Sequence, residues 1–248
     1  MTRADIHCDN IQKSFGAVET VSQLSIVFKS GQTTALVGPS GCGKSTILRM
    51  IAGLETPDTG SIRIGQETPR QVARRGGLSM AFQDPSLLPW RSVRSNIALG
   101  AELARKPVDR VDELIDLVGL VGFSDHRPAE LSGGMRQRAA IARSLISAPD
   151  VLLLDEPFGA VDAITRRRLN RDLPPLWRER KTTTLLVTHS VEEAVLLSDR
   201  VIVLCPRPAR VLADIPVDLH HNRALPETNA PAFRDLAMRV LTALEEAA

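Results

Sequence analysis

Residues 38–46 read GPSGCGKST, which fits the spacing G-x-x-x-x-G-K-[ST] of a loop that surrounds phosphate groups. The apolar, β-branched residues 33–37 before it predict a buried strand, and residues 45–54 after it predict a helix. This order is the context that the spacing requires, because the N-terminus of the helix then points at the bound anion. We therefore predict a nucleoside triphosphate site in an α/β fold, in preference to a chance glycine-rich turn.

Each residue of this loop has a predicted part in the site. The glycines let the backbone N–H groups face one point, Lys44 supplies a charge to the β- and γ-phosphates, and the Ser45 hydroxyl is placed to bind Mg²⁺. The candidate nucleotide contacts are Gly38, Pro39, Ser40, Gly41, Cys42, Gly43, Lys44, Ser45 and Thr46.

A second apolar run, residues 151–154, ends in Asp155 and Glu156. Buried parallel strands have this composition, and ligands of open α/β sheets bind at the carboxyl ends of strands. We expect Asp155 to hold Mg²⁺, directly or through water, and Glu156 to act as the base toward the attacking water. The alternative is a strand that ends in a solvated acidic turn.

Two further apolar runs end in polar residues. Residues 182–187 lead to His189, which can donate a hydrogen bond to a γ-phosphate oxygen. Residues 80–82 lead to Gln83, whose amide can contact Mg²⁺ or the attacking water. A structural histidine and an ordinary loop glutamine are the alternatives.

Residues 131–138 read LSGGMRQR, and together with the loop at 38–46 they make the chain resemble the ATP-binding subunits of ABC transporters. The resemblance covers about residues 5–215. The matching segments are the Walker A loop at 38–46, the Q-loop at Gln83, the signature motif at 131–138, Walker B at 151–156, the D-loop at 159–162 and the switch residue His189.

The chain departs from the usual family sequence at two of the expected nucleotide contacts. Phe15 matches the aromatic residue that stacks on adenine, although tyrosine is usual there, and stacking needs only the ring. The D-loop reads GAVD where SALD is commoner, but it keeps Asp162.

The resemblance implies a RecA-like P-loop NTPase core with an N-terminal antiparallel β subdomain and an inserted α-helical subdomain at about residues 84–148. The ATPase domain spans residues 1–218, and a tail spans residues 219–248. Residues 231–246 of the tail fit an amphipathic helix, which we expect to pack against the core domain rather than to make a regulatory or dimer contact. Its apolar positions are Phe233, Leu236, Val240, Leu241 and Leu244.

The resemblance also implies an ATPase that splits ATP into ADP and phosphate with Mg²⁺ and works as a dimer. Two copies, or this chain and a close paralogue, meet head to tail. Each ATP lies between the Lys44 loop of one copy and the signature motif of the other. The expected contacts of that motif are Ser132, Gly133 and Gly134.

Residues 82–90 (FQDPSLLPW) and 188–194 (THSVEEA) resemble the nitrate, sulfonate and taurine class of importers. This implies a membrane permease that docks near Leu87, Leu88 and Trp90, with a solute-binding protein acting indirectly. It places the chain peripherally on the cytoplasmic face of the inner membrane and leaves the transported solute open. The alternative for Trp90 is packing inside the helical lobe.

The competing function is a soluble ABC ATPase that acts on ribosomes or DNA. A single ATPase domain, with no sustained heptads between Lys44 and Asp155, favours the importer instead. The net charge of +2, from 31 basic and 29 acidic residues, gives no drive toward nucleic acid. No apolar run approaches the roughly eighteen residues of a membrane span, and the N-terminus lacks a signal-peptide stretch, so we expect a cytosolic chain with a separate permease.

Overall fold

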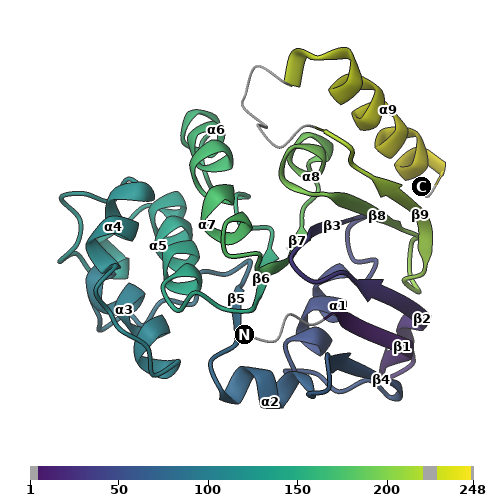
Figure 1. The fold of residues 1–248 in the computed structure, drawn as a ribbon, viewed down its shortest axis with the longest axis horizontal. Helices are drawn as coiled ribbons and strands as arrows, with labels where there is room; N and C mark the ends of the chain where they lie inside the picture. The colour runs from purple at the N-terminus through teal and green to yellow at the C-terminus, as the bar shows by residue number, and fades with distance from the viewer. Residues whose placement is uncertain (1–4, 220–227, 247–248) are drawn as a thin grey trace.

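The computed structural model describes residues 5–219 and 228–246, and a six-stranded sheet forms its centre (Figure 1). Five strands of this sheet are parallel, and the edge strand β9 is antiparallel to β8. In sheet order the strands are β5 (Leu78–Ala81), β6 (Val151–Asp155), β7 (Thr183–Val187), β3 (Thr33–Val37), β8 (Arg200–Leu204) and β9 (Val211–Pro216).

The central strands are short and apolar because both of their faces are covered. Every residue of β3, β6 and β7 is buried, as expected for parallel strands between two layers. Side chains alternate between two cores: Leu36 and Leu153 join one apolar cluster, while Ala35 and Leu152 join the other.

The first of these cores lies between the parallel sheet and a three-stranded antiparallel sheet. The order of the second sheet is β2-β1-β4. Helix α1 (Lys44–Ile51), which follows the glycine-rich loop, contributes Ile47 and Leu48 to this core. The remaining elements of this side are β1 (Ile6–Phe15), β2 (Val18–Phe28), β4 (Thr59–Ile64) and α2 (Pro69–Arg74).

The chain between β5 and β6 forms a helical lobe, which Figure 1 shows at the left, set apart from the antiparallel sheet. Its elements are α3 (Val93–Leu103), α4 (Val111–Leu117), the 3-10 helix η1 (Pro128–Glu130) and α5 (Gly133–Leu145). The predicted fold class is therefore confirmed: a parallel-sheet core carries an antiparallel subdomain and an inserted helical one.

The other face of the parallel sheet is covered by helices that follow β6, β7 and β9. They are α6 (Ala163–Asp172), α7 (Pro174–Arg178), α8 (Val191–Leu197) and α9 (Pro231–Glu246). Among the described residues, none of the helices has the length and apolar character that crossing a membrane requires.

Helix α9 has the bounds predicted from its apolar pattern, and it packs on α8, β8 and β9 as expected (Figure 1). Phe233 and Val240 are buried against these elements. The predicted apolar face is wrong at Leu241, which is 41% exposed because the contact surface is narrower than the apolar stripe. Residues 220–227 of the predicted tail, and residues 1–4 of the predicted domain, lie outside the described residues.

Candidate nucleotide-binding and catalytic site

The glycine-rich loop joins β3 to α1, and the start of α1 is open. Gly43 occupies the N-cap position with φ 114°, and no side chain accepts a hydrogen bond from the first N–H groups of the helix. A Cβ atom at Gly43 would lie 2.9 Å from the carbonyl oxygen of Thr20, so only glycine fits this position without a shift. The free N–H groups and the helix dipole therefore face the space inside the loop, where an anion is favoured.

Lys44 is 6% exposed, and its ammonium group lies within the loop. Its Nζ donates hydrogen bonds to the carbonyl oxygens of Gly38 and Pro39, each over 2.8 Å. The loop thus satisfies its own cation with carbonyl oxygens, which phosphate oxygens can replace with stronger, charge-assisted bonds.

Arg207, in the segment that follows β8, is hydrogen-bonded to the glycine-rich loop. The sequence analysis did not identify this residue as part of the site. Its Nε and Nη2 both donate to the carbonyl oxygen of Gly41, over 3.0 and 2.8 Å. The same segment is tied to β2, because the N–H of Ala209 donates to Thr20 and its carbonyl accepts from Ser22. No spacing rule marks an arginine that arrives from a distant strand.

Ser45 and Asp155 meet beneath the loop, as the sequence predicts for two residues that share a metal ion. The Ser45 hydroxyl lies 2.9 Å from Oδ1 of Asp155. Burial raises the pKa of the Asp155 carboxyl, and the hydrogen bond from Ser45 opposes that effect. A buried carboxylate beside a hydroxyl is a set of hard oxygen donors, so these residues fit Mg²⁺.

Glu156, Gln83 and His189 come together from three strand ends. Oε2 of Glu156 lies 3.3 Å from Nε2 of Gln83 and 3.5 Å from Nδ1 of His189. The three lie at the carboxyl ends of β6, β5 and β7, which are neighbours in the sheet. This cluster is the arrangement that the sequence predicts, and it holds the groups suited to activating a water molecule.

The backbone of Glu156 has an unusual conformation that no motif reveals. Its φ is 47°, a left-handed value that costs a residue with a side chain about 1–2 kcal/mol. The conformation is held because the Glu156 N–H donates to the carbonyl of Val187, while its own carbonyl accepts from Gly159. Strain of this kind is common where a side chain must point into a site.

The signature motif lies at the start of α5, on the helical lobe. The Ser132 hydroxyl accepts a hydrogen bond from the N–H of Met135 and so caps the helix. A Cβ atom at Gly134 would lie 2.8 Å from the carbonyl oxygen of Ala160, which explains glycine there. Gly133 lies beside the same D-loop residue, with its Cβ position 4.0 Å from the Ala160 side chain.

In the described part of the chain, no hydrogen bond joins this motif to residues 38–46. Figure 1 shows α5 in the lobe at the left and α1 apart from it, beside the antiparallel sheet. Within one copy, the structure therefore does not bring Ser132, Gly133 and Gly134 to the Lys44 loop.

Asp162 and Phe15 lie at the margins of the site. Asp162 is the N-cap of α6, and its Oδ1 accepts from the N–H of Thr165, which lowers the pKa of the carboxyl. Phe15 ends β1 with an exposed ring, and Nζ of Lys13 lies 5.4 Å from the ring centre. Asp162 therefore has a structural part within its own chain, and the Phe15 ring has a face available for stacking.

The apolar residues Leu87, Leu88 and Trp90 of the loop after Gln83 do not form one cluster, because they lie in different surroundings. Trp90 is 69% exposed, so the alternative that it packs inside the lobe is wrong. Leu87 instead packs against the core. The Leu88 backbone is held at both of its polar groups by the buried Asn96 side chain, over 2.8 and 3.1 Å.

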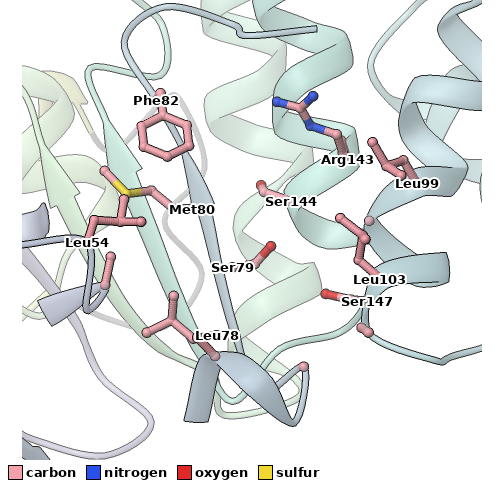
Figure 2. A pocket seen from close by; sticks show the side chains of 15 residues that line it. Leu54, Leu78, Ser79, Met80, Phe82, Leu99, Leu103, Arg143, Ser144 and Ser147 are labelled. Carbon is pink, nitrogen blue, oxygen red and sulfur yellow. The ribbon is translucent and has the colours of Figure 1, made fainter. Parts of the chain in front are cut away.

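A pocket of about 360 Å³ opens between the parallel sheet and the helical lobe (Figure 2). Arg143 stands on its lobe side and donates to the carbonyl oxygens of Pro85 and Ser86, which belong to the loop after Gln83. The pocket is lined mainly by apolar side chains from both subdomains, among them Leu54, Leu78, Met80, Phe82, Leu99 and Leu103.

Several known proteins are similar to the chain in sequence. A family profile described as ABC transporter matches residues 21–159. An uncharacterized ABC transporter ATP-binding protein of Methanocaldococcus jannaschii is 38% identical, over 98% of this chain and 92% of the relative. An aliphatic sulfonates import ATP-binding protein of Bacillus licheniformis is 41% identical, over 94% and 92%. A taurine import ATP-binding protein of Roseobacter denitrificans is 44% identical, over 81% and 78%.

A solved structure shares the fold as well. It is described as the dimeric post-hydrolysis state of the ATP-binding cassette MJ0796 with ADP and Pi. Its TM-score is 0.79 at 27% sequence identity, and the match covers 87% of this chain and all of that one.

Proposed function

The chain is an ATP-binding member of the ABC transporter family, and we propose that it powers the import of a small sulfonate-like or related anionic solute through a separate membrane permease. The convergence of Gln83, Glu156 and His189 beside the Ser45–Asp155 pair carries the part of this proposal that concerns ATP hydrolysis. The left-handed backbone of Glu156, which costs free energy, supports a functional part for its side chain. Relatives named for sulfonate and taurine import support the class of solute.

In the proposed mechanism the phosphates of ATP enter the loop and take the place of its carbonyl oxygens on Lys44. The open N–H groups of α1 donate to the phosphate oxygens, and the exposed ring of Phe15 stacks on adenine. Ser45 and Asp155 would hold Mg²⁺, with the Gln83 amide as a further oxygen donor, and the ion would supply positive charge to the phosphates. Glu156 then accepts a proton from the attacking water, and His189 donates a hydrogen bond to a γ-phosphate oxygen.

A second copy, or a close paralogue, completes each site in this proposal. Ser132, Gly133 and Gly134 lie away from the Lys44 loop of their own chain, which supports the proposal that they contact the ATP of another. The Ser132 hydroxyl uses an oxygen lone pair to cap α5, so its proton remains available for a γ-phosphate oxygen. Asp162 begins α6 beside this surface.

The permease is proposed to insert a short helix into the pocket between the parallel sheet and the lobe (Figure 2). The pocket offers apolar walls, with Leu54 and Leu103 both exposed at its edge. Trp90 lines a separate hollow on the lobe and is proposed as a second part of the docking surface, whereas Leu87 packs inward and supports the loop after Gln83. Movement of a docked helix would reach Gln83 through Arg143, which holds two carbonyl oxygens of the same loop.

Affinity purification from gently solubilised native membranes tests the proposed partner. We expect a multi-span permease to be recovered with the wild-type chain and in smaller amounts with Trp90→Ala. Arg167→Ala is the control, because Arg167 is exposed on α6 and lies in neither the pocket nor the loop. Recovery with ribosomes, nucleic acid or soluble proteins alone would contradict import and favour a soluble ABC ATPase.

The Glu156→Gln variant tests the chemistry independently of any partner. We expect ATP binding to persist while kcat falls by about 10²–10⁴, the range for loss of a general base. Wild-type turnover in this variant would remove Glu156 from its proposed role.

A further inference from the structure

Glu193, on α8, is a buried carboxylate that the proposed mechanism does not use. It is 7% exposed and lies four residues after His189. Its Oε2 accepts a hydrogen bond of 2.7 Å from the Thr188 hydroxyl, and its backbone N–H donates to the Ser190 hydroxyl over 3.2 Å. Glu193 therefore contacts the residues on both sides of His189.

The Thr188 hydroxyl also accepts from the N–H of Ser190, over 3.0 Å. The backbone around His189 is thus closed into a tight turn, and the Glu193 carboxylate holds one side of it. Since Nδ1 of His189 lies 3.5 Å from Glu156, the orientation of this turn sets where the imidazole stands in the catalytic cluster.

The other carboxylate oxygen of Glu193 faces a different functional loop. Its Oε1 lies 3.6 Å from Nε of Arg166, on α6. Nη2 of Arg166 donates to the carbonyl oxygen of Val161, over 2.9 Å, and Val161 is the D-loop residue before Asp162. One carboxylate therefore connects the turn of His189 with the D-loop.

The Arg166 end of this connection is incompletely bonded. Its Nε is buried and has no hydrogen-bond partner among the residues that the structure describes, and it lies 3.6 Å from Oε1 of Glu193. A buried guanidinium N–H without a hydrogen bond is costly, so the charge of Glu193 beside it is the interaction that stabilises Arg166 Nε. Burial raises the pKa of the Glu193 carboxyl, while the hydrogen bond from Thr188 and the charge of Arg166 oppose the shift.

We propose that Glu193 is a positioning residue that orients His189 for hydrolysis and couples it, through Arg166, to the D-loop. The inference rests on the proposed function, in which His189 faces the ATP of its own chain and the D-loop lies at the surface that meets a second copy. A change at one nucleotide would then be transmitted to the contact with the other copy through Thr188, Glu193, Arg166 and Val161.

Variants at Thr188 separate positioning from a general effect on folding. Thr188→Val keeps the shape but removes the hydroxyl, and we expect kcat to fall about tenfold, because small misplacements at a reacting centre have large effects. The affinity for ATP should stay within about twofold, since neither the Thr188 hydroxyl nor the Glu193 carboxylate contacts the nucleotide in the proposed site. Thr188→Ser should restore most of kcat, because it returns the hydroxyl; equal kcat in the valine variant and wild type would overturn the proposal.

Glu193→Gln tests the charge, since glutamine still accepts from Thr188 but no longer attracts Arg166. We expect an intermediate loss of kcat with unchanged ATP affinity, and Glu192→Gln, exposed on the same helix, is the matched control. Arg166→Met should lower kcat to a similar extent, and the double variant with Glu193→Gln should be no slower than the worse single one. The coupling would be contradicted if the fold losses of kcat in the two single variants multiplied in the double variant. It would also be contradicted if KM rose and kcat stayed unchanged.

The outcome for this inference is distinguishable from that for the proposed function. If the wild-type chain hydrolyses ATP and Glu156→Gln does not, the catalytic assignment stands whatever Glu193 does. Normal kcat in both Glu193→Gln and Thr188→Val would then overturn only the positioning role.

Discussion

Two helices of the molecule begin with their N-termini at proposed phosphate contacts, and they begin differently. Helix α1 follows Gly43 with no side-chain cap, and the ammonium of Lys44 lies in the loop before it. Helix α5 follows Ser132, whose hydroxyl already bonds the N–H of Met135. The first N–H groups of α1 have no side-chain cap and can donate to a bound anion. At α5 the Ser132 hydroxyl already caps the helix, and its proposed phosphate contact is made only across the surface between two copies.

The two helices also differ in their surroundings, because α1 is packed in the core and α5 starts at an exposed position. Ile47 and Leu48 fix α1 between two sheets, so the phosphate loop belongs to the core of the chain. Helix α5 starts on the inserted lobe, where Ser132 is exposed. An exposed contact on the lobe is suited to meeting a nucleotide held by another chain rather than to holding one itself.

Removing the charge at α1 should produce the largest effect on binding. In Lys44→Ala we expect the affinity for ATP to fall about 100-fold, because charge-assisted bonds to two phosphates contribute about 1.5–3 kcal/mol. Nucleotide titration followed by calorimetry measures this, with Lys181→Ala, an exposed lysine, as the control. Near-normal affinity would show that the open end of α1 does not depend on this cation.

Ser132→Asp separates capping from phosphate contact at α5. Aspartate caps helices about as well as serine, so the free energy of unfolding should change by less than about 0.5 kcal/mol. The added negative charge faces the proposed γ-phosphate, so kcat should fall by about tenfold or more while ATP affinity of the single chain is kept. Unchanged hydrolysis in a folded Ser132→Asp chain would mean that α5 has no phosphate contact.

Alanine at the two N-cap positions should have unequal effects on stability. Gly43→Ala places a Cβ 2.9 Å from a backbone oxygen at φ 114°, so we expect a loss of about 2–3 kcal/mol in the free energy of unfolding. Ser132→Ala removes only a cap and should cost about 1 kcal/mol. Urea unfolding monitored by circular dichroism compares them, and equal losses would contradict the difference between the two helix starts.

The phosphate loop and the strand ends at the site were predictable from the sequence, because their chemistry requires particular residues at short spacings. Phosphate binding requires the glycines and Lys44 at set spacings, and the strand ends at Asp155 and His189 follow from apolar runs of strand length. Because these runs lie side by side in a parallel sheet, their ends had to converge, and Gln83, Glu156 and His189 do so.

Contacts that depend on tertiary packing were not predictable in the same way. Arg207 reaches the carbonyl of Gly41 from 166 residues away, and Arg166 reaches Glu193 across two helices. Helical periodicity placed Leu241 on the packed face of α9, but the surface that receives α9 is too narrow to cover it. Such contacts follow from how elements are oriented, which short spacings do not encode.

If the start of α5 contacts the ATP of another copy, dimerisation should require both ATP and an uncharged side chain at Ser132. Glu156→Gln, which should retain ATP, would be measured by size-exclusion chromatography with light scattering, alone and combined with Ser132→Asp. We predict that ATP converts the single variant to dimers, while the double variant binds ATP and stays monomeric. Equal dimerisation of both variants would contradict this contact.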